Sequence, residues 1–238
     1  MRRFSDDGEL GQYTADIIEA LVKAKPEAKI CIAAGTSSFP VFDALAARVK
    51  SGRLSFKKAS FFGMDEWCGL PMDADGAMAD FLRRHFLNAV DFGYTFLFDG
   101  MAEPEAECAR AEEFFRRRGA LDIIVFGIGV NGHVALNEPG VSPDERTHVA
   151  AVSPVTANVA QKYFSGKAPK LTKGISIGLA NAAEAGKILL VANTPAKRHA
   201  VEEILKLLAA GQSSREYPAS IAAAMPGAEL LVTDAVFE

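Results

Sequence analysis

A histidine and a glutamate follow a glycine-rich segment in the middle of the chain. Residues 121–140 read LDIIVFGIGVNGHVALNEPG, in which His133 and Glu138 come within six residues of Gly132. The run before the glycines is rich in Ile and Val, as in a strand buried on both faces of a parallel sheet. Glycines let the backbone turn tightly and approach a ligand closely. A strand, a glycine loop, and then a His and a Glu together predict an α/β active site.

The same segment also matches a glycine pattern of dinucleotide-binding sites. Residues 127–132 (GIGVNG) spell GxGxxG after the predicted strand. Such a site also needs a helix that opens at the third glycine and an acidic residue at the end of the next strand. Here residues 137–140 (NEPG) break the chain, and the next apolar run, 148–152, ends in Ser-Pro without an acid. These departures argue against a nicotinamide cofactor.

A loop of small residues near the N-terminus is a candidate anion site. Residues 29–33 (KICIA) predict a buried strand and residues 41–49 predict a helix, and Gly35, Thr36 and Ser37 lie between them. A strand, loop and helix in this order point free backbone N–H groups and hydroxyls at an anion. An ordinary strand-to-helix turn with a Ser or Thr N-cap uses the same unpaired N–H groups. The loop alone leaves both interpretations open.

An aspartate and a lysine follow two other predicted strands. Asp65 comes just after residues 58–63 (KASFFG), and Lys197 follows residues 187–192 (KILLVA). Adjacent residues of an extended chain point to opposite sides, so at most one of Asp65 and Glu66 faces a common crevice. Taken alone, an Asp after a strand is more often a turn or cap residue than a catalytic base.

Predicted helices and strands alternate along the rest of the chain. Helices are predicted over 9–25, 76–90, 105–118 and 195–208, further strands over 147–152, 174–179 and 228–233, and a helix or mobile loop over 154–166. This alternation predicts an α/β fold in one domain over residues 1–238. Its central sheet is expected to be mostly parallel, with helices on both faces.

In an open α/β sheet, the carboxyl ends of the strands line one crevice. That rule places residues 35–37, Asp65, His133, Glu138 and Lys197 near one another. The hydroxyl loop and the lysine could hold a phosphate, while the Asp, His and Glu could move protons. A metal site needs two or three clustered His or Cys ligands, and His133 stands alone among carboxylates. We therefore expect acid/base chemistry on a phosphorylated small molecule, with no metal and no other cofactor.

Composition excludes several classes of partner. The formal charge is −4 and the basic residues are scattered, so no electrostatic footprint for nucleic acid is present. No apolar run reaches membrane-spanning length, and the two N-terminal arginines precede no signal-peptide core. Three widely spaced cysteines fit a reducing cytoplasm, where we expect the protein to act. The sequence gives no indication of the oligomeric state.

Two segments resemble the core motifs of the glucosamine-6-phosphate deaminase/isomerase family. They are FFGMDEWCGLP (residues 61–71) and FGIGVNGHVALNEPG (residues 126–140). The resemblance covers nearly the whole chain, and the combination MDEW…GHVALNEP is specific to the family. It implies a Rossmann-like three-layer α/β sandwich. It also implies conversion of an amino-sugar 6-phosphate to a ketose 6-phosphate and ammonia.

The resemblance also implies roles for the acid/base residues. Asp65 corresponds to the general base, and His133 to the histidine that assists ring opening. Glu138 corresponds to the glutamate that orients and polarises that histidine. Asn131 and Gly132 belong to the same motif, the first as an expected catalytic residue and the second as a substrate contact.

The remaining correspondences concern the substrate phosphate. Gly35, Thr36 and Ser37 correspond to the family's phosphate loop. Lys197 corresponds to a phosphate-binding lysine after the second-to-last strand. Lys162 corresponds to a basic residue on a mobile segment, which is an arginine in well-known members.

The chain departs from the family pattern in three places. It has Asn131 where the family usually has the Asp of DGH, and residues 34–38 read AGTSS where the family usually reads TGxTP. It also ends soon after the last predicted strand, without the extension of the allosteric hexameric members. Asn131 together with DEW resembles the branch of galactosamine-6-phosphate isomerase/deaminase, so the C4 epimer of the substrate stays open.

Two other functions compete with deamination. The 6-phosphogluconolactonases share the fold and the glycine-His loop, but their loop continues with a small hydroxyl residue and Leu-Phe in place of NEP. A non-catalytic sugar-phosphate sensor is the second alternative, with Asn131 as a sign of decay. The presence of Asp65, His133 and Glu138 argues against the sensor.

Overall fold

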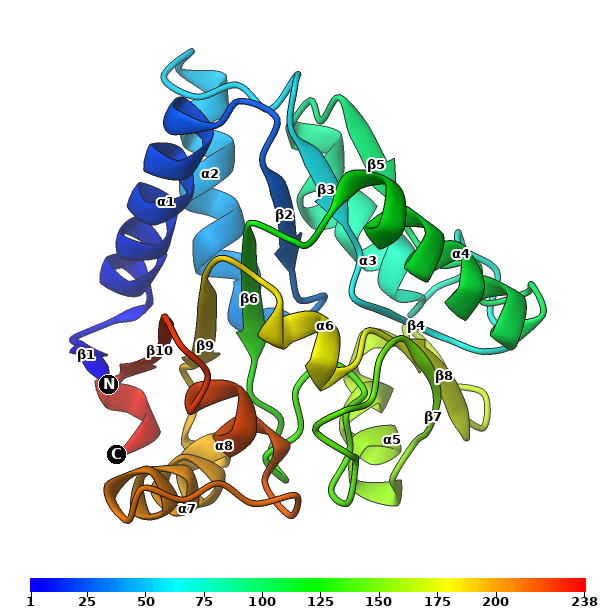
Figure 1. Ribbon diagram of the computed structural model, residues 1–238, viewed down its shortest axis with the longest axis vertical. Coiled ribbons are helices and arrows are strands. Elements are labelled where there is room, and N and C mark those ends of the chain that lie inside the picture. The colour runs from blue at the N-terminus through cyan, green and yellow to red at the C-terminus, as the bar shows by residue number, and fades with distance from the viewer.

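Seven parallel strands form the central sheet of the computed structural model, which describes residues 1–238 (Figure 1). In spatial order they are β1 (Arg2–Phe4), β10 (Ala228–Thr233), β9 (Ile188–Ala192), β6 (Ile123–Gly127), β2 (Lys29–Ile32), β3 (Ser60–Phe62) and β5 (Tyr94–Phe96). The sequence predicts all of these except β1 and β5, which are three-residue strands at the two edges.

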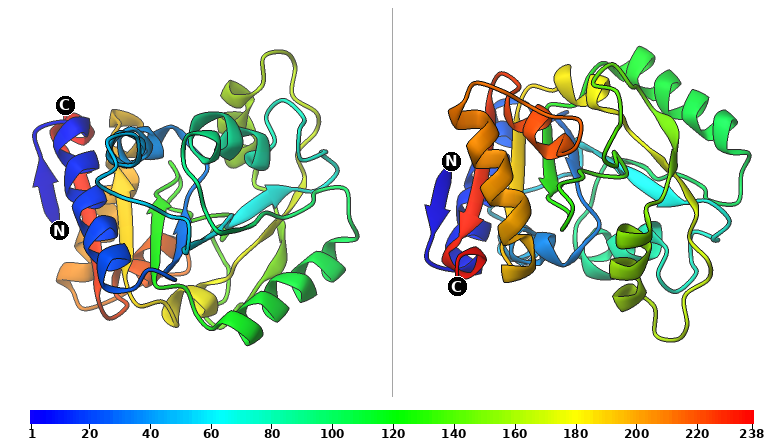
Figure 2. Two further views of the ribbon diagram at one scale, coloured as in Figure 1. Left: turned by 90° about the horizontal axis from the view of Figure 1, so that it is seen from above. Right: turned by 90° about the horizontal axis from the view of Figure 1, so that it is seen from below.

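Helices cover both faces of this sheet (Figure 2). Successive residues of a central strand face opposite sides: on β9, Leu189 and Val191 join one core cluster, and Ile188 and Leu190 join the other. The helices that share the first cluster are α1 (Asp7–Ala24), α2 (Phe39–Lys50) and α3 (Met78–His85). Those that share the second are α4 (Pro104–Arg118), α6 (Leu179–Ala183), α7 (Arg198–Ala209) and α8 (Pro218–Ala223). The predicted three-layer α/β sandwich is confirmed.

The first two helices pack closely because a glycine lies where they meet. A Cβ atom on Gly11 would lie 2.3 Å from the Pro40 carbonyl oxygen, so a larger residue would force α1 away from α2. A buried ion pair of 2.9 Å between Arg48 of α2 and Glu19 of α1 joins the same pair of helices. The contact at Pro40 thus fixes the start of α2, which follows the predicted anion loop, and the ion pair holds its last turn.

A second, three-stranded antiparallel sheet stands apart from the central one. It consists of β4 (Asp65–Trp67), β8 (Lys173–Ser176) and β7 (His148–Ala151), in that order. The strands predicted over 147–152 and 174–179 therefore exist but lie outside the parallel sheet. Because β4 begins three residues after β3 ends, Asp65 lies at the junction of the two sheets.

Two predicted helices are shorter in the structure than in the prediction. The helix expected over 76–90 ends at His85, because Phe86 leaves the helical conformation and stacks on Phe42 at 4.6 Å. A short 3-10 helix, η2 (Leu87–Ala89), follows. Residues 154–166 contain α5 (Pro154–Ala160) and the 3-10 helix η3 (Gln161–Tyr163). No helix combines the length and apolar character needed to cross a bilayer.

Candidate active site

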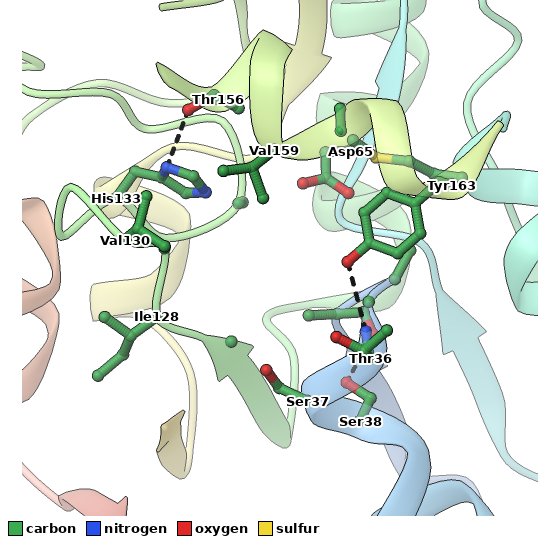
Figure 3. Close-up of a pocket in the computed structure, with 18 of the residues that line it drawn as sticks. Thr36, Ser37, Ser38, Asp65, Ile128, Val130, His133, Thr156, Val159 and Tyr163 are labelled. Atoms are coloured by element: carbon green, nitrogen blue, oxygen red, sulfur yellow. Dashed lines mark hydrogen bonds between the residues drawn. The ribbon is translucent and has the colours of Figure 1, made fainter. Parts of the chain in front are cut away.

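Loops at the carboxyl ends of β2, β3, β6 and β9 meet around a pocket of about 250 Å³ (Figure 3). These strands are consecutive neighbours in the sheet, so their loops are brought to one place, as expected for an open α/β sheet. Helices α5 and η3 supply another wall, and we call residues 154–163 the cover. The predicted site residues that line the pocket are Gly35, Thr36, Ser37, Asp65, His133, Lys162 and Lys197.

Three predicted residues lie outside the pocket wall. Asn131 and Glu138 lie behind His133 and reach the pocket only through its ring. Gly132 has a φ of 81° in a tight turn, and a Cβ there would lie 2.7 Å from the ring of Tyr217, while its expected contact with substrate stays a prediction. Gly132 thus serves the turn and its packing, and the structure gives it no contact with the pocket.

Asp65 and Glu66 point in opposite directions, as their positions on β4 predict. The Asp65 carboxyl faces the pocket, whereas Glu66 accepts hydrogen bonds of 2.8–2.9 Å from the backbone N–H groups of Trp67, Met78 and Ala79. Met78 and Ala79 begin α3, where a carboxylate is favoured by the helix dipole. Glu66 therefore anchors the helix, and Asp65 alone is available for chemistry.

Both of these carboxyl groups are hard to ionise. Burial raises the pKa of Asp65 to about 8, and repulsion from Glu66 contributes to the rise. Burial also raises the pKa of Glu66 to about 7, although its three backbone hydrogen bonds act in the opposite direction. A carboxyl group with a strongly raised pKa in a pocket is a frequent mark of a general acid or base.

The imidazole of His133 lies flat on the backbone of the glycine loop. A Cβ atom on Gly129 would lie 2.3–2.5 Å from three atoms of the ring, so only glycine fits beneath it. The Gly129 N–H donates to the His133 carbonyl at 2.9 Å and closes the turn. No helix opens after Gly132. The glycine pattern thus accommodates the histidine ring and lacks the helix on which a dinucleotide site depends.

Asn131 fixes which nitrogen of His133 carries the hydrogen. Its Oδ1 lies 2.7 Å from His133 Nδ1 and accepts from the His133 backbone N–H at 3.3 Å. Its Nδ2 donates to Glu138 at 2.8 Å, which confirms the orientation of the amide. Because an amide oxygen only accepts, Nδ1 must be protonated, and Nε2 of the neutral ring is free to take a proton.

Glu138 is linked to His133 only indirectly, through Asn131. Its nearest oxygen is 3.9 Å from His133 Nδ1, beyond hydrogen-bond distance, and Asn131 bridges the two. The expected orientation of the ring by Glu138 is thus relayed by an amide. Burial lowers the pKa of His133, the charge of Lys197 lowers it further, and Glu138 partly opposes both. The ring is therefore neutral at pH 7.

We expect the Asn131→Asp variant to raise the pKa of His133. A carboxylate oxygen 2.7 Å from Nδ1 would stabilise the imidazolium, and protonation of the ring would relieve the repulsion between the new carboxylate and Glu138, which lie 2.8 Å apart. NMR titration of the ring should show the rise, and the limb of kcat/KM that reports His133 should move to higher pH. Glu138→Gln should shift the pKa in the opposite direction. Superimposable titrations and an unchanged preference between C4 epimers would leave Asn131 as a loop residue only.

Two lysines converge on the loop after β2. Lys197 donates to the Ser37 hydroxyl, and Lys162 Nζ lies 3.4 Å from the Thr36 hydroxyl. Neither ammonium has a carboxylate within 4 Å among the ion pairs of the structure; both instead contact hydroxyl groups. Burial lowers the pKa of Lys197 to about 8, and repulsion from Lys162 contributes. An anion at this end of the pocket would relieve that repulsion.

Sequence reasoning missed two polar residues of the cover. Thr156 Oγ1 lies 3.1 Å from His133 Nδ1, and the Tyr163 hydroxyl accepts from the Thr36 N–H at 3.4 Å. The strand-end rule finds residues in loops that leave the sheet, and the cover is not such a loop. The sequence did contain an indication of this helix. A serine N-cap followed by proline, Ser153 and Pro154, marks a helix start just before Thr156.

A single pocket that holds acid/base groups and two cations defines an α/β enzyme that acts on a small anionic molecule. The chain belongs to the family of glucosamine-6-phosphate isomerases and 6-phosphogluconolactonases, whose model matches residues 8–232. This match confirms the family that the two sequence motifs indicate.

Curated relatives named glucosamine-6-phosphate deaminase are similar over almost the whole chain. The Mycolicibacterium smegmatis protein is 33% identical over 97% of this chain and 88% of its own length. The Beutenbergia cavernae protein is 34% identical over the same shares. A solved structure of a monomeric glucosamine-6-phosphate deaminase superimposes with a TM-score of 0.92 at 27% identity, covering 99% of this chain and 98% of that one.

Solved 6-phosphogluconolactonases share the fold at lower similarity. The Thermotoga maritima enzyme superimposes with a TM-score of 0.74 and is 17% identical, covering 98% of this chain and 97% of that chain. At this identity the match concerns the architecture, since one fold supports different reactions.

Proposed function

We propose that the protein converts glucosamine 6-phosphate and water to fructose 6-phosphate and ammonia. The observation that carries this proposal is that Asp65, His133 and the hydroxyl loop line one pocket (Figure 3). Lys162 and Lys197, which contact hydroxyls of that loop and have no carboxylate partner, line the same pocket. The names of the relatives support the amino sugar as substrate. The resemblance of Asn131 and DEW to the galactosamine branch stays a prediction about the C4 epimer.

The substrate phosphate is placed at the lysine end of the pocket. Gly35 precedes a short 3-10 helix, η1 (Thr36–Ser38), which contains Thr36 and Ser37 and continues into α2. Backbone N–H groups and hydroxyls at such a helix start can donate to an anion. Lys197 adds a charge-assisted hydrogen bond. With the phosphate there, the sugar ring extends toward the wall that carries His133 and Asp65.

His133 is placed to open the sugar ring. Its Nδ1 is held by Asn131, so Nε2 can take the proton of the C1 hydroxyl and return it to the ring oxygen. The ring begins and ends this step neutral, which suits its lowered pKa.

Asp65 then moves the proton that defines the isomerisation. Its carboxylate takes the hydrogen from C2 and returns it to C1 through an enediol-like intermediate with nitrogen on C2. Water adds at C2, ammonia leaves, and the ketose 6-phosphate remains. A positioned base of this kind contributes typically about 10²–10⁴-fold to the rate.

We expect kcat/KM to peak near pH 8. Asp65 acts when ionised, so activity is lost as the pH falls below its pKa of about 8. Lys197 binds phosphate when protonated, so activity is lost as the pH rises above its pKa of about 8. The pH dependence of kcat/KM reports ionisable groups of the free enzyme and the free substrate. The Lys197→Arg variant tests whether the alkaline limb belongs to Lys197, because an arginine stays protonated in this range. That limb should vanish in the variant while the acid limb stays. A pH profile of unchanged shape would mean that Lys197 does not cause the alkaline limb.

Ammonia release from glucosamine 6-phosphate and galactosamine 6-phosphate, measured side by side, tests the proposed function. We expect release from glucosamine 6-phosphate at the higher rate. A faster reaction with galactosamine 6-phosphate would assign the other epimer. Hydrolysis of 6-phosphogluconolactone, with no ammonia released from either amino sugar, would identify the protein as a lactonase. Binding of a sugar phosphate without turnover would identify it as a sensor.

We further propose that residues 1–238 act as one sugar-phosphate domain in the cytoplasm. All three cysteines are free, and two of them, Cys31 and Cys108, are buried. Thiols without partners suit a reducing compartment.

A further inference from the structure

Tyr163 reaches from the cover to the loop that is proposed to bind phosphate. Its hydroxyl accepts from the Thr36 N–H at 3.4 Å, and Figure 3 shows the ring directed across the pocket toward that loop. A Cβ atom on Gly35 would lie 3.2 Å from the same hydroxyl, so the glycine leaves room for it. The phenol therefore lies among the groups assigned to the phosphate.

Aromatic packing holds this phenol in place. The Tyr163 ring meets Phe81 edge to face at 5.4 Å, and Phe81 stacks on Phe39 at 5.5 Å. The backbone N–H of Ser165 donates to Asp75 at 2.6 Å, which ties down the chain just beyond the tyrosine. A group held by packing on several sides binds a ligand at a smaller cost in side-chain entropy.

The Tyr163 hydroxyl has a hydrogen to donate. It accepts from Thr36, and the structure shows no protein acceptor for its own O–H. The ammonium of Lys162 lies 5.0 Å from the centre of the ring, where a cation interacts favourably with the aromatic face. The pocket thus contains a fixed O–H donor beside the Lys162 ammonium, next to the loop that Lys197 also contacts. This arrangement suits an anion with several acceptor oxygens.

We propose that Tyr163 is a substrate-binding residue whose hydroxyl donates a hydrogen bond to the substrate phosphate. While it does so, its contact with the Thr36 N–H keeps the cover against the loop. The inference rests on the proposed function, because it takes the sugar phosphate as the occupant of the pocket. The proposed phosphate site then has three kinds of donor: the loop of residues 35–37, the lysines, and the neutral Tyr163 hydroxyl of the cover.

The Tyr163→Phe variant removes this one oxygen and keeps the aromatic packing. A hydrogen bond from a neutral hydroxyl to an anionic phosphate is charge-assisted, so its loss corresponds to a change of roughly 10- to 100-fold. We expect KM for glucosamine 6-phosphate, and the inhibition constant of inorganic phosphate, each to rise by that factor with kcat nearly unchanged. Tyr13→Phe is the matched control, since its hydroxyl donates to Glu229 on another part of the protein.

Each other outcome overturns the inference in a recognisable way. Tighter phosphate binding in Tyr163→Phe would mean that the hydroxyl competes with the ligand. Unchanged constants in an enzyme that releases ammonia would remove Tyr163 from the site and leave the proposed function standing. If the wild type neither bound phosphate nor released ammonia, the inference and the proposed function would both fall.

Discussion

Replacing Asp65 with Asn should lower kcat at least about 100-fold while substrate binding changes little. The carboxyl of Asp65 has a pKa of about 8, so near neutral pH it is largely protonated before it acts. An amide resembles that protonated form in size and hydrogen bonding, but it cannot take the proton from C2. The variant thus holds the site in its inactive protonation state.

Steady-state ammonia release and substrate binding, measured on the same preparation, check this expectation. Asp91→Asn is the matched control because its side chain is largely exposed and forms only a loose contact of 3.9 Å with Lys57. Near-normal turnover in Asp65→Asn would exclude Asp65 as the base.

The Lys197→Ala variant should raise KM by roughly 10- to 100-fold with a smaller change in kcat. A hydrogen bond to a charged group is worth about 1.5–3 kcal/mol, which corresponds to that range. The effect falls on KM if the ammonium binds the phosphate equally in the ground and transition states. Lys162 is exposed, so solvent screens it and Lys162→Ala should have a weaker effect.

Initial rates over a range of glucosamine 6-phosphate concentrations measure the two constants. Lys57→Ala serves as the control, because that side chain is 74% exposed. An unchanged KM in Lys197→Ala would place the phosphate elsewhere in the pocket.

Burial explains which strands could be predicted from the sequence. The central strands β2, β6 and β9 are apolar apart from Lys29 at the start of β2, because helices cover them on both faces. β1 and β5 are short edge strands with exposed residues, and β4 reads Asp-Glu-Trp, so none of the three shows that pattern. These strands depend on pairing with distant segments, which local sequence does not encode.

The residues of the candidate site also fall into a group that the sequence could predict and a group that it could not. Asp65, His133 and Lys197 could be placed together because each follows a parallel strand and the strands share one edge. The bridging position of Asn131 could not, since it depends on how a turn folds back on itself. Tyr163 belongs to a segment between strands of the second sheet, and its approach to Thr36 arises only from tertiary packing.

The back-to-back arrangement of Asp65 and Glu66 has a consequence for how this enzyme can change over evolution. Glu66 secures the start of α3, and its charge also helps to keep Asp65 protonated. A substitution that neutralises Glu66 would make the base ionise at lower pH and would weaken the anchor of a core helix in the same step. The working pH of the enzyme and the integrity of its scaffold are therefore linked traits, and selection on either one constrains the other.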